Sequence, residues 1–174
     1  MEHFRVGLVG CGGIAQVHGA VLRDLEGADL TACADIRPER AHAFAEKFGG
    51  TPYDSLEAML DAEHLDCLHI CTPHYLHTPM ARLAAEKGIH VFTEKPPVMD
   101  RAQWADFQSL EQAPVRVGVC FQNRYNQSVQ LLRHLLDSGR PGKLLGARAF
   151  VTWKREAPYY TESGWRGSLE TEGG

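Results

Sequence analysis

The stretch "GCGGIA" lies between a short apolar run and a helical pattern, and this position constrains the fold more than any other feature. The run Phe4–Val9 predicts a strand, and a helical period of apolar side chains begins at Ile14. The stretch has the form G-x-G-x-x-A, in which Gly10 permits a tight turn and Gly12 permits close approach of a pyrophosphate. Backbone N–H groups around Gly13 and Ile14, at the positive end of the helix dipole, would hold the phosphates. The sequence therefore predicts a dinucleotide-binding strand–loop–helix unit.

An acidic residue follows the second predicted strand. The apolar run Leu30–Ala34 ends at Asp35, whose carboxylate can accept hydrogen bonds from ribose hydroxyls and would repel a 2′-phosphate. This favours NAD over NADP as the cofactor, although Arg37 leaves NADP open. Two other interpretations stay open on these residues alone. One is a glycine-rich turn without a nucleotide, and the other is an S-adenosylmethionine enzyme.

Strand and helix patterns alternate over most of the chain. Further strands are expected at 67–71, 89–93 and 115–121. Helices are expected from Pro38, from a capping box of Asp54 and Glu57, at 77–87 and from Asp100. The first helix is expected to bury one apolar stripe, which consists of Ile14, Val17, Val21, Leu22 and Leu25. This alternation predicts an α/β fold with a doubly wound parallel sheet.

The alternation stops after Gln122, where we expect a domain boundary. Residues 1–122 are predicted to form an NAD(P)-binding Rossmann domain. Residues 123–174 are predicted to form a linker helix, ending at Gly139, and the incomplete start of a second domain. The stretch "RPGKLLGARAFVTW" (140–153) predicts a long strand in that second part, which is too short to bury a core of its own.

Two of the predicted strands end in residues suited to a site. One is followed by Thr72 and Pro73, and the next by Glu94 and Lys95. Ligands of doubly wound sheets bind at the carboxyl ends of the strands, so both stretches are expected to reach the cofactor. An ammonium group at Lys95 could polarise a substrate hydroxyl and take part in proton transfer, which makes this lysine the catalytic candidate.

The chain resembles the Gfo/Idh/MocA oxidoreductases, a family that includes glucose-fructose oxidoreductase and inositol 2-dehydrogenase. The resemblance rests on the order and spacing of "VGLVGCGGIAQVH", "CTPHYLH", "GIHVFTEKP", "NRYNQSV" and "GWRG". It implies a Rossmann domain followed by an α+β antiparallel-sheet domain, of which residues 123–174 are expected to be the truncated start. It further implies a dehydrogenase that uses NAD or NADP on a hydroxyl or keto carbon of a sugar, polyol or related compound. It also implies a role for Lys95 near the substrate hydroxyl, for Glu94 near the cofactor ribose, and for His77 beside the cofactor.

The resemblance also bears on the end of the sequence. In this family a Trp-Arg stretch such as Trp165–Arg166 leads into a glycine-rich turn. A helix with a His-x-x-x-Asp or His-x-x-Asp pair then completes the active site. Here the sequence reaches the turn at Gly173 and Gly174, so we expect the catalytic half to be missing. We expect cofactor binding, leave turnover by the 174-residue chain open, and keep a nucleotide-binding module without catalysis as the alternative.

Several weaker candidates surround the predicted site. Substrate contacts are expected from Lys95 and from the polar and aromatic residues Arg124, Tyr125, Trp153, Trp165 and Arg166, some of which would equally suit a subunit interface. His74 and His77 lie three residues apart, but without a third ligand we expect no metal site. His18 and His69 are interpreted as structural residues.

Composition excludes some classes of partner. The net charge of −4 leaves no basic footprint, so no nucleic-acid partner is expected. No apolar run approaches the roughly 20 residues that span a bilayer, so no membrane segment is expected. The five cysteines form no paired motif and lie mostly in apolar runs, which favours a cytoplasmic protein. By resemblance we expect the full-length protein to be a homo-oligomer.

Overall fold

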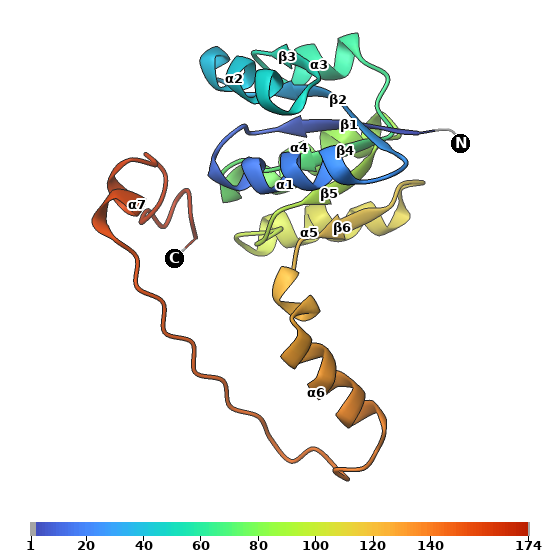
Figure 1. The fold of residues 1–174 in the computed structure, drawn as a ribbon, viewed down its shortest axis with the longest axis vertical. Coiled ribbons are helices and arrows are strands. Elements are labelled where there is room, and N and C mark those ends of the chain that lie inside the picture. Colours follow the sequence, from blue (N-terminus) through green and yellow to red (C-terminus); the bar gives the residue numbers. More distant parts are fainter. Residues whose placement is uncertain (1–2, 174) are drawn as a thin grey trace. The chain divides into compact units, whose positions relative to one another are not determined.

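Six parallel strands form the central sheet. A computed structural model describes residues 3–173, and the strands lie in the spatial order β3-β2-β1-β4-β5-β6 (Figure 1). Their bounds are β1 Phe4–Val9, β2 Ala28–Ala34, β3 Thr51–Tyr53, β4 Cys67–Ile70, β5 His90–Thr93 and β6 Val117–Val119. This order confirms the predicted doubly wound sheet. It places the topological switch point between β1 and β4.

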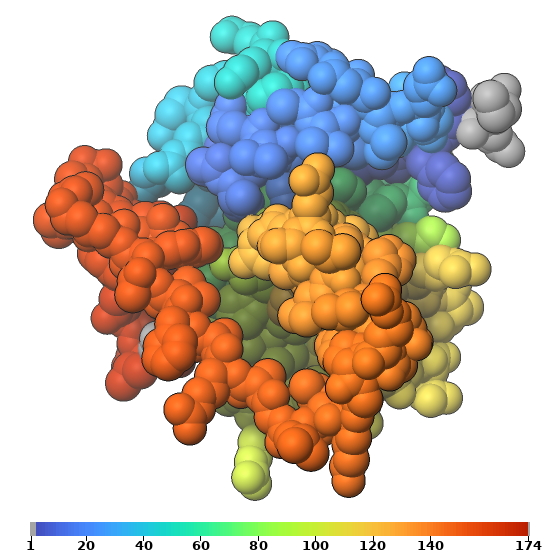
Figure 2. Space-filling model, turned by 60° about the horizontal axis from the view of Figure 1, so that its bottom comes forward, coloured from blue at the N-terminus to red at the C-terminus, as the bar shows by residue number. Residues whose placement is uncertain are grey.

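Helices cover both faces of the sheet (Figure 1). Figure 2 shows this part of the chain in blue to yellow. The five helices between the strands are α1 Gly13–Asp24, α2 Pro38–Phe48, α3 Leu56–Ala62, α4 His77–Glu86 and α5 Arg101–Ser109. Leu8 of β1 points to the face of α1 and α2, where it packs in a buried cluster with Phe44. Val9 points to the opposite face, in a cluster with Met59 of α3 and Ala81 of α4. Successive β1 side chains thus serve two different cores, as the two-residue period of a strand requires.

Local signals at helix starts explain where the elements begin. Asp100 caps α5 as predicted, because its side chain accepts a hydrogen bond from the Gln103 N–H at 2.8 Å. The predicted cap of α3 at Asp54 is wrong. Ser55 is the cap, and its hydroxyl accepts a hydrogen bond from the Ala58 N–H at 3.1 Å. The short edge strand β3, which contains Pro52, was not predicted, since proline interrupts a strand pattern.

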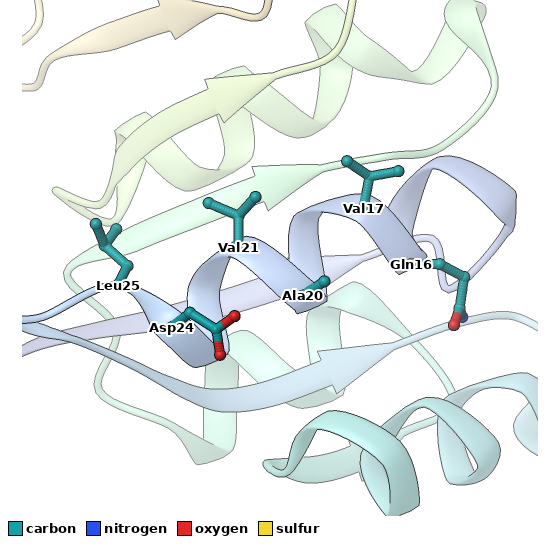
Figure 3. A pocket seen from close by; sticks show the side chains of 6 residues that line it. All are labelled: Gln16, Val17, Ala20, Val21, Asp24 and Leu25. Atoms are coloured by element: carbon teal, nitrogen blue, oxygen red, sulfur yellow. The ribbon is translucent and has the colours of Figure 1, made fainter.

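The predicted buried stripe of α1 is also wrong. Of its five residues only Leu22 is buried, whereas Val17, Val21 and Leu25 are 57%, 58% and 51% exposed. Figure 3 shows these three side chains along one side of the helix, where they line a shallow hollow with Gln16, Ala20 and Asp24. The face that packs on the sheet consists of small or polar residues, namely Ala15, His18 and Gly19, together with Leu22. A Cβ at Gly19 would lie 2.7 Å from the Phe48 ring, so the close packing of α1 against α2 requires the small residue.

The chain divides into two compact units. We call residues up to Cys120, together with those from Trp165 onward, the sheet unit, and Phe121–Gly164 the second unit. The remaining helices of the described residues are η1 His74–Leu76 and η2 Leu110–Gln112 in the sheet unit, and η3 Gln122–Tyr125, α6 Gln127–Asp137 and α7 Ala157–Thr161 in the second unit.

The second unit contains the predicted amphipathic helix α6 but not the predicted strand. Residues 143–156 have no regular secondary structure. A strand needs a neighbour for its N–H and C=O groups, and within residues 3–173 none pairs with this stretch. Of the turn expected at Gly173 and Gly174, Gly174 lies outside the described residues. No helix in residues 3–173 has the length and apolar character required to cross a bilayer.

Candidate functional site

The glycine loop joins β1 to α1 at the switch point. Gly10 has φ of 87°, a left-handed conformation that side chains other than glycine rarely adopt. A Cβ at Gly10 would lie 2.8 Å from the carbonyl group of Cys71 and from the N atom of Thr72. The Gly10 N–H donates to the Ala34 carbonyl at 2.8 Å. The glycine therefore allows the ends of β1, β2 and β4 to meet.

The N-terminus of α1 offers an open cradle. Its N-cap, Gly12, has no side chain to accept a hydrogen bond from the first-turn N–H groups. A Cβ at Gly12 or at Gly13 would meet no atom within 4 Å, so the space beside these two residues is open. Ile14 borders this space and is 38% exposed. Unpartnered N–H groups facing an open space suit a pyrophosphate, and the site fits a dinucleotide in this respect.

Asp35 ties the end of β2 to the glycine loop. Its buried carboxylate accepts hydrogen bonds from the Cys11 N–H at 2.8 Å and from the Arg37 N–H at 2.9 Å. Each carboxylate oxygen has a further lone pair with which it can accept a hydrogen bond from a ribose hydroxyl. The Arg37 side chain is exposed beside it. Ile36, which sequence reasoning did not single out, is 88% exposed and presents an apolar surface next to this acid.

His77 connects the turns that follow β4 and β5. The ring is fully buried, with Nδ1 2.7 Å from the Pro96 carbonyl oxygen and Nε2 2.9 Å from the Thr72 carbonyl oxygen. Burial lowers the pKa of His77, and the two carbonyl acceptors oppose that shift. Thr72 and Pro73 therefore lie in a turn that is fastened to the Glu94–Pro96 turn.

A buried polar network lies between α1, β4 and the end of β5. His18 Nε2 donates to Glu94 Oε1 at 3.1 Å, and the Lys95 N–H donates to Glu94 Oε2 at 3.2 Å. The two Nδ1 atoms of His18 and His69 are 3.1 Å apart. Burial and the neighbouring His18 lower the pKa of His69 to about 4, so its ring is neutral at pH 7. Burial raises the pKa of Glu94, but hydrogen bonds from His18, Lys95 and Cys120 outweigh it, so the net shift is downward.

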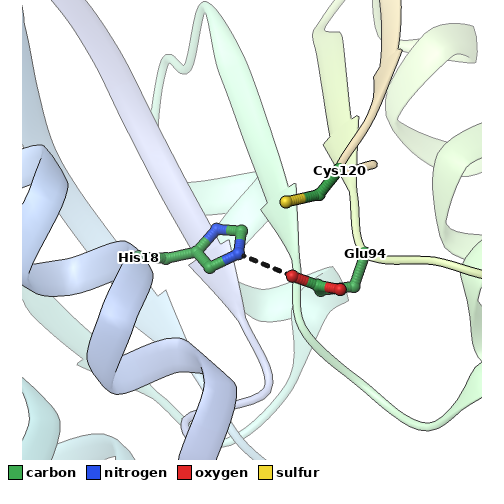
Figure 4. A group of neighbouring side chains, drawn as sticks. All are labelled: His18, Glu94 and Cys120. Carbon is green, nitrogen blue, oxygen red and sulfur yellow. Dashed lines mark hydrogen bonds and ion pairs between the residues drawn. The ribbon is translucent and has the colours of Figure 1, made fainter. Parts of the chain in front are cut away.

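Sequence reasoning treated His18 and His69 as structural and did not consider Cys120. Figure 4 shows His18, Glu94 and Cys120 facing one another. One ligating atom of each lies within 4.8 Å of the others, a set of donor types that can bind a metal ion. The hydrogen bonds that Glu94 accepts from the histidine and the thiol account for this grouping without an ion. The signal in the sequence was the position of His18 on the same helical face as Ala15 and Leu22.

The candidate substrate residues belong to both units of the chain. Lys95 is exposed at the end of β5, between Glu94, which is buried, and Pro96, which is half-buried. Arg124, Tyr125 and Trp153 belong to the second unit, where the two aromatic side chains are 79% and 67% exposed.

Trp165 and Arg166 belong to the sheet unit. The Trp165 ring contacts the His74 ring with a centroid distance of 4.8 Å, and the Arg166 guanidinium lies over the Trp165 ring. His74 Nδ1 donates to the Glu172 carbonyl at 2.8 Å. The segment from Trp165 to Glu172 therefore contacts η1, the short helix that directly follows the Thr72–Pro73 turn.

Comparison with known proteins shows extensive similarity. The family model described as "Oxidoreductase family, NAD-binding Rossmann fold" matches residues 4–125. The chain is 27% identical to a glucose-6-phosphate 3-dehydrogenase of Bacillus subtilis over 95% of its own length and 50% of that protein. It is 32% identical to an inositol 2-dehydrogenase of Leifsonia xyli over 91% of its own length and 48% of that protein.

A solved structure agrees with this similarity. The WlbA dehydrogenase of Bordetella pertussis, crystallised with NADH and UDP-GlcNAcA, superposes with a TM-score of 0.89 at 32% identity. The match covers 98% of this chain and 53% of that one. The chain thus spans about half the length of the relatives it matches.

Proposed function

Because this chain belongs to the oxidoreductase family with the NAD-binding Rossmann fold, we propose that it serves hydride transfer between a nicotinamide dinucleotide and a carbon atom of its substrate. The reacting carbon carries a hydroxyl or keto group, and the substrate is a sugar, a polyol or a related compound. The names of the relatives, a sugar-phosphate dehydrogenase and an inositol dehydrogenase, support this substrate class.

The observation that carries the proposal is the convergence of two features at the switch point. The open N-terminus of α1 and the fixed carboxylate of Asp35 suit the pyrophosphate and the ribose of a dinucleotide. The Glu94–Lys95 turn follows β5, which lies next to β4 in the sheet, and it presents an exposed ammonium group. An S-adenosylmethionine enzyme has no need of the second feature.

Each residue would have a distinct chemical role. The first-turn N–H groups of α1 would bind the phosphates, and Asp35 would accept hydrogen bonds from the ribose hydroxyls. When bound, the nicotinamide supplies the acceptor or donor of the hydride. In the oxidation direction the substrate O–H proton must leave as the carbonyl forms, and we assign its transfer to Lys95 Nζ. Trp165 and Arg166, fastened to η1, are assigned to the substrate side.

Titration of the purified chain with NADH and NADPH, followed by nucleotide fluorescence, tests cofactor binding. We expect NADH to bind more tightly, because Asp35 repels a 2′-phosphate. Asp35→Asn keeps acceptor capacity for the Cys11 N–H but removes the charge, and should narrow the preference for NADH by at least about tenfold. Asp54→Asn, which alters an exposed acid, is the matched control and should leave both affinities unchanged. Failure of both nucleotides to bind the wild-type chain would refute the proposal.

A second assay separates the enzyme from the alternative. The chain is incubated with NAD and a panel of sugar phosphates, nucleotide sugars and inositols, and NADH formation is recorded. Turnover that falls at least about a hundredfold in Lys95→Met supports the enzyme. Tight NADH binding without turnover supports a nucleotide-binding module. The alternative is favoured by one observation, that residues 143–156, which include the candidate Trp153, have no regular secondary structure to hold a substrate-binding side chain in place.

A further inference from the structure

We infer that two buried histidines, His18 and His77, hold the Glu94–Pro96 turn from its two ends and thereby position Lys95. The inference rests on the proposed function, because it concerns the lysine assigned there to proton transfer. Both histidine side chains are buried and act on Lys95 through other residues, so we treat them as positioning residues rather than catalytic ones. Lys95 itself is exposed, and its own side chain is not what fixes the turn.

The first contact joins His18 to Glu94, the residue before Lys95. Glu94 is only 6% exposed, and an ionised carboxylate is an acceptor at both oxygens. His18 donates to Oε1, the Lys95 N–H donates to Oε2, and Cys120 donates as well. The Glu94 side chain thus bridges the backbone of Lys95 to helix α1. Charge-assisted hydrogen bonds of this kind are roughly twice as strong as neutral ones.

One proton in this network can be assigned from its acceptor. Because Glu94 accepts from His18 Nε2, that nitrogen carries a proton. The other ring nitrogen of His18, Nδ1, lies at hydrogen-bond distance, 3.1 Å, from the Nδ1 of His69. His18 thus contacts a partner through each ring nitrogen, Glu94 on one side and His69 on the other, and the two contacts fix the orientation of its ring.

The second contact joins His77 to Pro96, the residue after Lys95. His77 faces the Pro96 carbonyl at 2.7 Å, and the Thr78 hydroxyl donates to the Pro97 carbonyl at 2.8 Å. Both side chains are at most 1% exposed and lie in the first turn of α4. Lys95 is therefore flanked by one residue fixed to α1 and by another fixed to α4.

This arrangement couples Lys95 to the cofactor cradle. The helix that supplies His18 is also the helix whose N-terminal N–H groups face the open space at Gly12 and Gly13. One rigid helix thus sets the position of the phosphates and, through Glu94, the position of the lysine. A displacement of α1 relative to β5 would change the distance between the two.

Amide hydrogen exchange of the Lys95 N–H, measured by NMR on the 15N-labelled full chain, tests the contact between His18 and Glu94. His18→Leu removes both ring nitrogens, and we expect Lys95 exchange to accelerate at least about tenfold, the loss of one charge-assisted hydrogen bond. His18→Gln places an amide nitrogen near the position of Nε2 and should restore exchange to within about threefold of wild type. The amides of Gly10 and Cys71, which donate hydrogen bonds to neighbouring strands, report the integrity of the sheet and should not change.

The controls separate this outcome from simpler ones. His42→Leu, at an exposed position of α2, should leave Lys95 exchange unchanged. If His18→Leu does not fold, Glu94→Gln replaces the carboxylate with a weaker acceptor and should accelerate Lys95 exchange in the same direction. A folded His18→Leu with wild-type Lys95 exchange, or His18→Gln as fast as His18→Leu, would overturn the inference. NADH titration of the same variants is read separately, because absence of nucleotide binding in the wild-type chain refutes the proposed function and leaves the exchange result standing.

Discussion

Helices α2 and α6 are alike in length and in the spacing of their apolar residues, yet they lie in very different surroundings. Both contain 11 residues. In α2, Ala41 and Phe44 are buried against the sheet. In α6, every apolar side chain is exposed, from Leu136 at 37% to Leu131 at 70%. Helical spacing of apolar residues therefore predicts a helix, whereas burial depends on whether a packing partner is present.

The largest predicted effect lies in the sheet unit, at the glycine loop. Gly10→Ala should lower the free energy of unfolding by roughly 4 kcal/mol, because φ of 87° strains alanine and its Cβ would lie 2.8 Å from the Cys71 carbonyl group. Urea denaturation followed by far-UV circular dichroism measures the change. Gly146→Ala is the control in the second unit, where a Cβ would meet no atom within 4 Å. Equal stability of the two variants would contradict the geometry of the loop.

A leucine pair tests the contrast between the units directly. Leu68→Ala removes a fully buried side chain from β4 and should cost about 3 kcal/mol. Leu132→Ala alters an α6 residue that is 54% exposed and should change stability by less than about 0.5 kcal/mol. The same denaturation experiment measures both. A loss above about 1 kcal/mol in Leu132→Ala would mean that α6 is covered in solution, and the contrast between α2 and α6 would disappear.

Acid should weaken the sheet unit through His69. Its pKa is about 4 in the folded chain and 6.5 as the ordinary value, so between these values the unfolded chain binds more protons. The stability that this group contributes is present above pH 6.5 and is lost as the pH falls towards 4. Between pH 7 and pH 5 the free energy of unfolding should fall by about 2 kcal/mol from this source. Glu94, whose pKa is lowered, contributes a loss of the same sign only at lower pH.

Denaturation curves recorded from pH 7 to pH 5 measure this dependence. His69→Asn cannot titrate and should flatten the curve of stability against pH. His42→Asn, at an exposed site, should leave the curve as in the wild type. An unchanged slope in His69→Asn would show that this histidine is solvated in solution and does not support His18.

The cofactor edge of the fold could be predicted because its elements are local in sequence. Gly10, Asp35 and Glu94 each follow directly after a strand, and parallel strands bring their carboxyl ends to one edge. The roles assigned to these residues remain predictions. The face of α1 could not be predicted, because large apolar residues looked like the core while the sheet is contacted by Ala15, His18 and Gly19. The close approach of α2 selects small residues there, and this tertiary fact has no local signal.

The histidine network was missed for a related reason. His18 and His69 are 51 positions apart in the sequence, and Cys120 lies further along. Each taken alone is an ordinary buried or half-buried residue, and only the order of the strands brings them to Glu94. The prediction of a strand at 140–153 was wrong for the opposite reason, because there a local signal was present and the tertiary partner was not. Its local pattern is that of a strand, but a strand forms only beside another strand.

The smallest predicted effect concerns the part of the chain that returns to the sheet unit. His74 fastens this segment through a hydrogen bond to the Glu172 carbonyl and an edge contact with the Trp165 ring. His74→Ala should lower the free energy that holds this segment against η1 by about 1 kcal/mol. That loss corresponds to roughly fivefold faster tryptic cleavage after Arg166. His74→Phe keeps a ring but loses the donor, so its rate of cleavage after Arg166 should lie between those of the wild type and His74→Ala.

Cleavage after Lys154, in the exposed second unit, is the internal reference and should proceed at the same rate in all three proteins. Cleavage after Arg166 as fast in the wild type as after Lys154 would mean that the segment is not fastened to η1. Trp165 and Arg166 would then behave like the second unit.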